Sequence, residues 1–204
     1  MSHDLSNAEA DVDAGGRGLA TLNPAPVKAY QITLRLHGAP GAFQHVRGTA
    51  QYDVINEDQC GNIEPATGTA SRITSQEPLE LTRISDEEYQ GTVYLDRMKD
   101  QDYYGRGICR WEFTGAGALL KATGAQEETR FLTFVDAPDL VAGKTYTRYY
   151  PKHDYPRAGP VEGRPDLPWR DDYPSRGRED RYEFVPALQD KLFSITVSAV
   201  AIKA

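Results

Sequence analysis

The stretch Tyr30-Gln31-Ile32-Thr33-Leu34-Arg35-Leu36 carries an apolar side chain at every second residue. This period of two is typical of a β-strand with one face in the core and the other in solvent. The turn signal Gly38-Ala39-Pro40-Gly41 follows, and alternation resumes in Phe43–Ile55. The inward residues expected in that second strand are Val46, Ala50, Tyr52 and Val54.

The same alternation of apolar and polar residues recurs along the rest of the chain. Further strands are expected at Pro78–Ile84, Tyr89–Leu95, Thr129–Val135, Lys144–Tyr150 and Leu192–Ile202. Gly107–Phe113 and Ala116–Ala122 are either two strands or one strand kinked at its glycines. Helical patterns are short and confined to Asp136–Ala142 and Val185–Lys191. The chain therefore predicts an all-β fold, an antiparallel β-sandwich of the immunoglobulin-like or a similar type.

Two segments depart from this pattern. Residues 1–26 are rich in Ala, Gly, Asp and Ser, which predicts a flexible tail or tether before a single domain at 27–204. Residues 151–190 form a long insertion rich in Pro, Tyr and Arg, with seven of the thirteen prolines. A loop of this length is usually functional or disordered. A binding surface, a structural cover over a sheet edge and disorder all remain open for it.

Composition excludes several classes of function. The chain has 204 residues, with 23 basic against 30 acidic side chains and a net charge of −7. This balance argues against a nucleic-acid partner, which needs a basic surface. Runs of apolar residues are too short for a transmembrane segment. The first twenty residues hold no apolar signal-peptide core, so either the protein is cytosolic or an export signal or lipid anchor precedes the printed sequence.

The two cysteines favour export. Cys60 lies in a predicted loop and Cys109 in a predicted strand, and a chain with one such pair is expected to form one disulfide. Because disulfides persist in oxidising compartments, this pairing indicates a compartment outside the reducing cytosol. Two unrelated free thiols are the alternative.

Catalytic and metal-binding patterns are not evident. The chain has neither a Gly-x-Ser-x-Gly motif nor a phosphate-binding glycine loop, and its four histidines lack a ligand partner two to four residues away. Asp96, Asp100 and Asp102 suit either calcium or, more simply, a solvated turn. With thirty acidic residues, no glycosidase pair stands out. We therefore expect no catalysis, no cofactor and no metal.

One motif resembles a known group of proteins. It consists of Tyr89-Gln90-Gly91-Thr92-Val93-Tyr94-Leu95-Asp96 and then Asp102-Tyr103-Tyr104-Gly105-x-Gly107-x-Cys109-x-Trp111. The motif resembles small proteins of Xanthomonadaceae and related Gram-negative bacteria, encoded beside antibacterial effectors of type IV and type VI secretion systems, often lipase-like toxins. Those proteins are similar to immunity proteins, and the likeness covers roughly residues 28–200. The resemblance implies a periplasmic protein that neutralises a cognate effector by binding it.

Aromatic and arginine side chains are the expected contacts with such a partner, because these types dominate binding energy at interfaces. The candidates are Tyr103, Tyr104, Arg106, Tyr155, Trp169, Arg170 and Tyr173. If the turn Asp102–Gly107 and the loop Pro151–Pro186 lie at opposite ends of the fold, one of them is not the interface. The main alternative is a small-ligand or carbohydrate-binding sandwich with Trp169 and the tyrosines as stacking platforms. An envelope hydrolase and a homo-oligomer also remain open.

Overall fold

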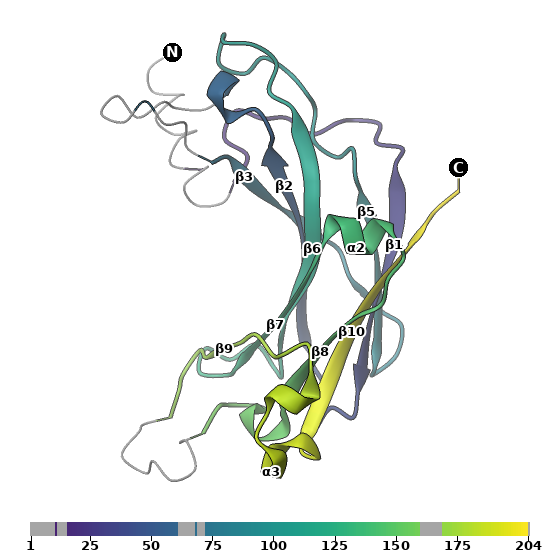
Figure 1. Cartoon of the computed structure of the whole chain (residues 1–204), viewed down its shortest axis with the longest axis vertical. Helices are drawn as coiled ribbons and strands as arrows, with labels where there is room; N and C mark the ends of the chain where they lie inside the picture. The colour runs from purple at the N-terminus through teal and green to yellow at the C-terminus, as the bar shows by residue number, and fades with distance from the viewer. Residues whose placement is uncertain (1–10, 12–15, 61–67, 69–71, 160–168, 204) are drawn as a thin grey trace.

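The computed structural model describes residues 11, 16–60, 68, 72–159 and 169–203. Within this part of the chain two five-stranded sheets pack face to face (Figure 1), so the predicted all-β sandwich is confirmed. The first sheet has the order β4 (Thr82–Arg83), β5 (Glu88–Tyr94), β1 (Ala29–His37), β10 (Leu192–Ala201), β8 (Tyr146–Pro151). The second has the order β3 (Thr74–Leu79), β2 (His45–Val54), β6 (Trp111–Lys121), β7 (Arg130–Asp136), β9 (Pro174–Ser175). Paired strands are antiparallel except β7 and β9.

The predicted alternation sets the register between β1 and β10. Leu34 lies opposite Val197 and Leu36 opposite Ile195, and all four side chains are buried. A shift of one residue would turn these side chains to solvent, so burial of one face specifies the pairing.

An aromatic cluster fills the core between the sheets. The ring of Phe131 on β7 is fully buried and lies 5.5 Å from Phe43, 5.7 Å from Tyr150 and 5.2 Å from Phe193, centroid to centroid. The hydroxyl of Tyr150 donates to the carbonyl of Leu132 at 2.7 Å. Burial raises the pKa of Tyr150, so this hydroxyl stays protonated and remains a donor.

The prediction of one strand over Pro78–Ile84 is wrong. The chain instead forms β3 and β4, which belong to different sheets. The crossing between them passes close to two glycines. A Cβ on Gly48 would overlap the carbonyl oxygen of Leu79, and a Cβ on Gly91 would overlap that of Glu80. Glycine at these positions therefore lets the chain step from one sheet to the other.

Of the two arrangements left open for Gly107–Phe113 and Ala116–Ala122, the single irregular strand is correct. Both ranges contribute to β6, which begins only at Trp111. Its register against β2 shifts between Gln51 and Tyr52, beside Gly115. This irregularity is of the kind that glycine in a strand often marks.

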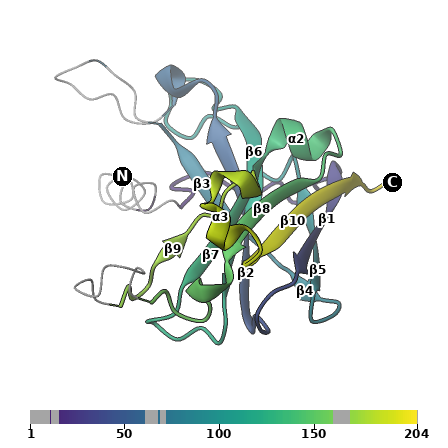
Figure 2. The same cartoon turned by 60° about the horizontal axis from the view of Figure 1, so that its bottom comes forward.

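The insertion 151–190 contains several short elements in its described part. They are η2 (Lys152–Asp154), β9, η3 (Arg181–Glu183) and α3 (Pro186–Gln189). Ser175 of β9 pairs with Phe131 of β7, and Arg178 exchanges two backbone hydrogen bonds with Tyr149 of β8 (2.7 and 3.0 Å). We call Pro174–Arg178 the seam, because it joins the two sheets along one edge (Figure 2). Residues 160–168 lie outside the described part.

The end of the predicted tail 1–26 packs on the sandwich. Ala20 is buried, and Leu22 forms a β-bridge with Met98. The amide of Asn23 donates to the carbonyl of Arg97 at 2.8 Å. Residues 1–10 and 12–15 lie outside the described residues, so the tether prediction is not tested there.

Both predicted helices are present and short. They are α2 (Ala137–Val141) and α3, and each has proline in its first turn, where the missing amide costs no hydrogen bond. Among the helices that the structure describes, none has the length and apolar character needed to cross a membrane.

Glu128 organises the turn between β6 and β7. Its buried carboxylate accepts from the amide of Thr123 at 2.8 Å, the hydroxyl of Thr123 at 2.7 Å and the amide of Gly124 at 2.9 Å. Burial alone would raise the pKa of Glu128, but these donors outweigh it and hold the pKa below the usual value of about 4.5 for a glutamate.

We expect Glu128→Gln to lower the free energy of unfolding by about 1–2 kcal/mol at pH 7, because charge-assisted hydrogen bonds are lost. Since the folded pKa lies below the unfolded one, the advantage of wild type is full above pH 4.5 and disappears as pH falls through the folded pKa. Urea denaturation from pH 3 to pH 7 checks this. Glu127→Gln is the matched control because Glu127 is exposed. An equal effect of both substitutions would contradict the prediction.

Candidate functional site

The predicted contact residues fall into two groups at opposite ends of β6. The first group lies on the turn at 102–107, and the second lies in the insertion 151–190. Near its start, the amide of Trp111 donates to the Asp100 carboxylate at 2.9 Å, close to the turn at 102–107. Near its end, Nζ of Lys121 lies 3.2 Å from the Asp172 carboxylate, beside the second group. The eleven residues of β6 separate these ends by about 34 Å at roughly 3.4 Å per residue. The turn and the insertion therefore do not form one continuous site (Figure 1).

The turn at the first end is held by Asp102. One oxygen of its carboxylate accepts from the amides of Tyr104 (3.3 Å), Gly105 (2.6 Å) and Arg106 (3.2 Å). Gly105 has a φ of +72°, a left-handed conformation that glycine adopts without strain. The Asp-x-x-Gly part of the motif thus has a structural explanation.

Tyr103 and Tyr104 brace the same end. The hydroxyl of Tyr103 accepts from the amide of Thr21 at 3.2 Å and donates to the carbonyl of Lys99. The rings of both tyrosines pack against a small cluster around the cysteines. Arg106 is exposed on the turn. That these three side chains contact a partner stays a prediction.

The predicted disulfide between Cys60 and Cys109 is present, with a Cα–Cα distance of 5.5 Å. Both cysteines are fully buried with Val54 and Ile73. The bridge fastens the loop after β2 to the segment that enters β6.

The aspartates of the acidic run at 96–102 accept hydrogen bonds from backbone amides. Asp96 accepts from the amides of Val27 and Lys28 at 3.0 Å each, while Asp100 and Asp102 accept from the amides described above. Burial acts to raise the pKa of Asp96, but the two amide donors outweigh it and lower the pKa. Each carboxylate therefore has a structural role, and within the described ranges no cluster of three or more His, Cys, Asp or Glu side chains is arranged to hold a metal.

Tyr155 is engaged inside the fold. Its ring packs edge-on against Phe43 at 5.3 Å, and its hydroxyl donates to the carbonyl of Ala42 at 2.7 Å. The structure thus gives this half-buried candidate a packing role, and that it also contacts a partner stays a prediction.

The other end carries an arginine–aromatic surface, formed by arginine and aromatic side chains of residues 146–148, 157 and 169–184. It holds all five cation–π pairs found among the described residues, with guanidinium-to-ring distances of 3.8–5.9 Å. The pairs are Arg148–Tyr146, Arg157–Trp169, Arg170–Tyr173, Arg178–Phe184 and Arg181–Tyr182. Three predicted contacts, Trp169, Arg170 and Tyr173, lie here. Trp169 is 54% exposed and Tyr182 is 73% exposed.

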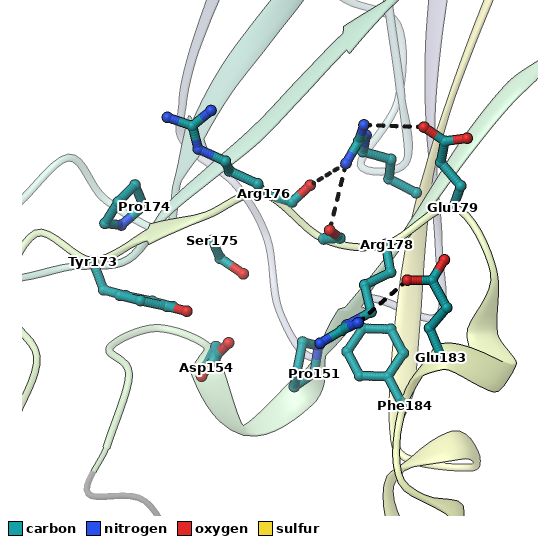
Figure 3. A pocket seen from close by; sticks show the side chains of 12 residues that line it. Pro151, Asp154, Tyr173, Pro174, Ser175, Arg176, Arg178, Glu179, Glu183 and Phe184 are labelled. Atoms are coloured by element: carbon teal, nitrogen blue, oxygen red, sulfur yellow. Dashed lines mark hydrogen bonds and ion pairs between the residues drawn. The ribbon is translucent and has the colours of Figure 1, made fainter.

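A groove of about 540 Å³ crosses this surface between β8, the seam and η3 (Figure 3). At its base is the buried carboxylate of Asp154, 3.3 Å from the guanidinium of Arg170 and 3.6 Å from Nε2 of His153. Burial raises the pKa of Asp154, and the neighbouring His153 side chain and Arg170 guanidinium offset only part of that rise.

The arginines that line the groove differ in their partners. Arg148 pairs with Glu179 and Arg178 with Glu183, each at 3.2 Å. By contrast, the exposed guanidinium of Arg176 has no hydrogen bond or ion pair with any residue that the structure describes. In Figure 3 it points away from both glutamates.

A second hollow of about 440 Å³ lies on the outer face of the second sheet. Its apolar wall is Phe134, whose ring packs over Gly115 and Gly117 of β6 and is 37% exposed. Side chains on these glycines would meet the ring, so the glycines make room for it. Arg148 and Arg176 line this hollow as well as the groove.

Sequence reasoning missed the Phe134 hollow and Arg176. The available signal was the Gly-x-Gly of β6, since glycines on the solvent face of a strand often accommodate an aromatic ring from the neighbouring strand. The register that places Gly117 opposite Phe134 comes only from the structure.

The comparisons with known proteins identify no relative. The chain matches no protein-family model, no curated protein and no solved structure.

Proposed function

We propose that the chain is an immunity protein, which binds and neutralises a cognate antibacterial effector toxin, such as a lipase-like toxin, in the periplasm. It acts by forming a stable protein–protein complex and performs no catalysis. The resemblance of residues 89–111 suggests the class of partner.

The observation that carries the proposal is the arginine–aromatic surface. Arg, Tyr and Trp are the side chains most enriched at the energetic centres of interfaces. Here arginines stack on the rings, as Arg170 does on Tyr173 at 3.8 Å. Side chains that are held in this way lose less conformational entropy on binding, which favours affinity.

The disulfide supports the proposed compartment. A buried bridge between distant parts of the chain is expected where thiols are oxidised, as in the bacterial periplasm. An effector that acts on the cell envelope would be met there.

Binding of a small carbohydrate is a second candidate, favoured by the Phe134 hollow. An exposed ring flanked by the amides of Gln51 and Gln76 has the elements of a sugar-stacking site. In this form the alternative uses Phe134 in place of Trp169 and the tyrosines, and it leaves the stacked arginines of the arginine–aromatic surface without a role.

We expect the purified chain to form a complex with the effector encoded beside it and to abolish the effector's activity at about equal concentrations. Size-exclusion chromatography and titration of effector activity measure the two effects. The control is an effector of the same class from an unrelated gene pair, which should stay active. Absence of a complex with the cognate effector at about 10 μM, a concentration at which even weak specific complexes form, would refute the proposed function.

A further inference from the structure

We propose that the Phe134 hollow and the groove act as one docking surface for a segment of the effector protein. That segment presents an acidic side chain to Arg176 and an adjacent apolar side chain to Phe134. The inference rests on the proposed function and specifies the surface and the chemistry of its partner.

The two depressions adjoin at the seam. Arg148 and Arg176 contribute to the walls of both, although one depression lies on the outer sheet face and the other at the end of the sandwich. A partner segment that enters the hollow therefore reaches the groove by passing Arg176.

Charge defines one half of the site. The residues that line the hollow include two arginines and no acidic side chain. Arg148 is already occupied, because its guanidinium binds Glu179 and the carbonyl of Arg176 at 3.0 Å. Of the two arginines that line the hollow, Arg176 is the one that lacks a counter-charge among the described residues. A carboxylate is its natural partner, since a guanidinium donates two parallel hydrogen bonds to one.

Apolar surface defines the other half. Phe134, Leu119 and Leu132 form an apolar wall of the hollow. Phe134 lies over the glycines of β6 and is partly exposed to solvent, so an incoming apolar side chain would bury both itself and the ring. The rim is polar, with Thr49, Gln51 and Gln76. An apolar centre with a polar rim is the usual anatomy of a protein interface.

A protein segment is favoured over a sugar because the hollow opens onto the arginine–aromatic surface, which offers further anchors. The chain carries a net charge of −7, which repels a strongly acidic partner as a whole. The site therefore suits one acidic residue beside an apolar one, on a partner that is not acidic overall.

The test measures affinity of the purified effector for four variants by isothermal titration calorimetry. Arg176→Glu is expected to weaken binding about 100-fold, as charge reversal at a paired site does. Arg110→Glu is the matched control: Arg110 is exposed at the disulfide end, and its reversal should change affinity less than about threefold. Gln76→Arg, which narrows the hollow without removing packing, should weaken binding about tenfold. Phe134→Ala should do the same, with its folding checked by thermal denaturation.

The outcomes separate the two proposals. If wild type binds the effector and Arg176→Glu binds as tightly, the docking surface is overturned while the proposed function stands. If wild type does not bind, both fail. A third outcome is that wild type binds a soluble oligosaccharide and Phe134→Ala does not, while Phe134→Ala still binds the effector. This result would assign the hollow to a sugar and overturn the docking surface. Recovery of Arg176→Glu affinity by an acidic-to-lysine change in the effector would establish the contact directly.

Discussion

Replacement of both Cys60 and Cys109 by alanine is expected to lower the free energy of unfolding by about 4 kcal/mol. The bridge joins residues 49 apart in sequence. Without it the unfolded chain gains the entropy of an open loop, which for about fifty residues amounts to roughly 4 kcal/mol. Both cysteines are fully buried, so lost packing adds to the effect. Urea denaturation of the variant and wild type measures the difference.

Reduction provides the control for this prediction. Reductant should destabilise wild type by a similar amount and leave the double alanine variant unchanged, because only wild type contains the bridge. A difference below about 1 kcal/mol between oxidised and reduced wild type would show that the bridge contributes little to stability.

Phe131→Ala is expected to cost about 4 kcal/mol, the usual cost of replacing a fully buried phenylalanine by alanine. Phe131 is 0% exposed and contacts four further aromatic rings, so its removal leaves a cavity that neighbouring strands cannot close. The measurement is again the urea midpoint, with an unchanged slope as evidence that the unfolded states are alike.

Phe134→Ala is the matched control because it removes the same side chain from the same strand. Phe134 faces outward and is 37% exposed, so we expect a loss of about 1 kcal/mol from the packing over the glycines. Equal losses for Phe131→Ala and Phe134→Ala would contradict the assignment of inner and outer faces of β7.

The fold was predictable where one face of a strand is buried. In β10 the alternation of Phe193, Ile195, Val197 and Ala199 reports burial directly, and all four are buried. The division of Pro78–Ile84 between two sheets was not predictable in the same way. Alternation continues through the crossing, and only the glycines on neighbouring strands allow it.

The candidate site was predictable in part. Trp169, Arg170 and Tyr173 drew attention as aromatic and arginine residues among prolines, and the structure places them on one surface with Arg178 and Phe184. Arg176 is not distinguished from its neighbours by type. Arg176 differs from Arg148 and Arg178 because those two form ion pairs with glutamates and Arg176 does not. Which arginine lies near a glutamate depends on the path of the seam.

The position of Arg176 on the seam couples recognition to the integrity of the sandwich. Because the seam pairs with β7 through Ser175 and with β8 through Arg178, opening of this edge would displace the docking residue. A partner that binds only the closed edge must therefore suppress its opening, by mass action. The same contact would shield the backbone of β8 from pairing with another chain. If the chain binds an effector as proposed above, the effector would thus stabilise the fold of the chain, and slower amide hydrogen exchange at Tyr149 and Arg178 in the complex would report this.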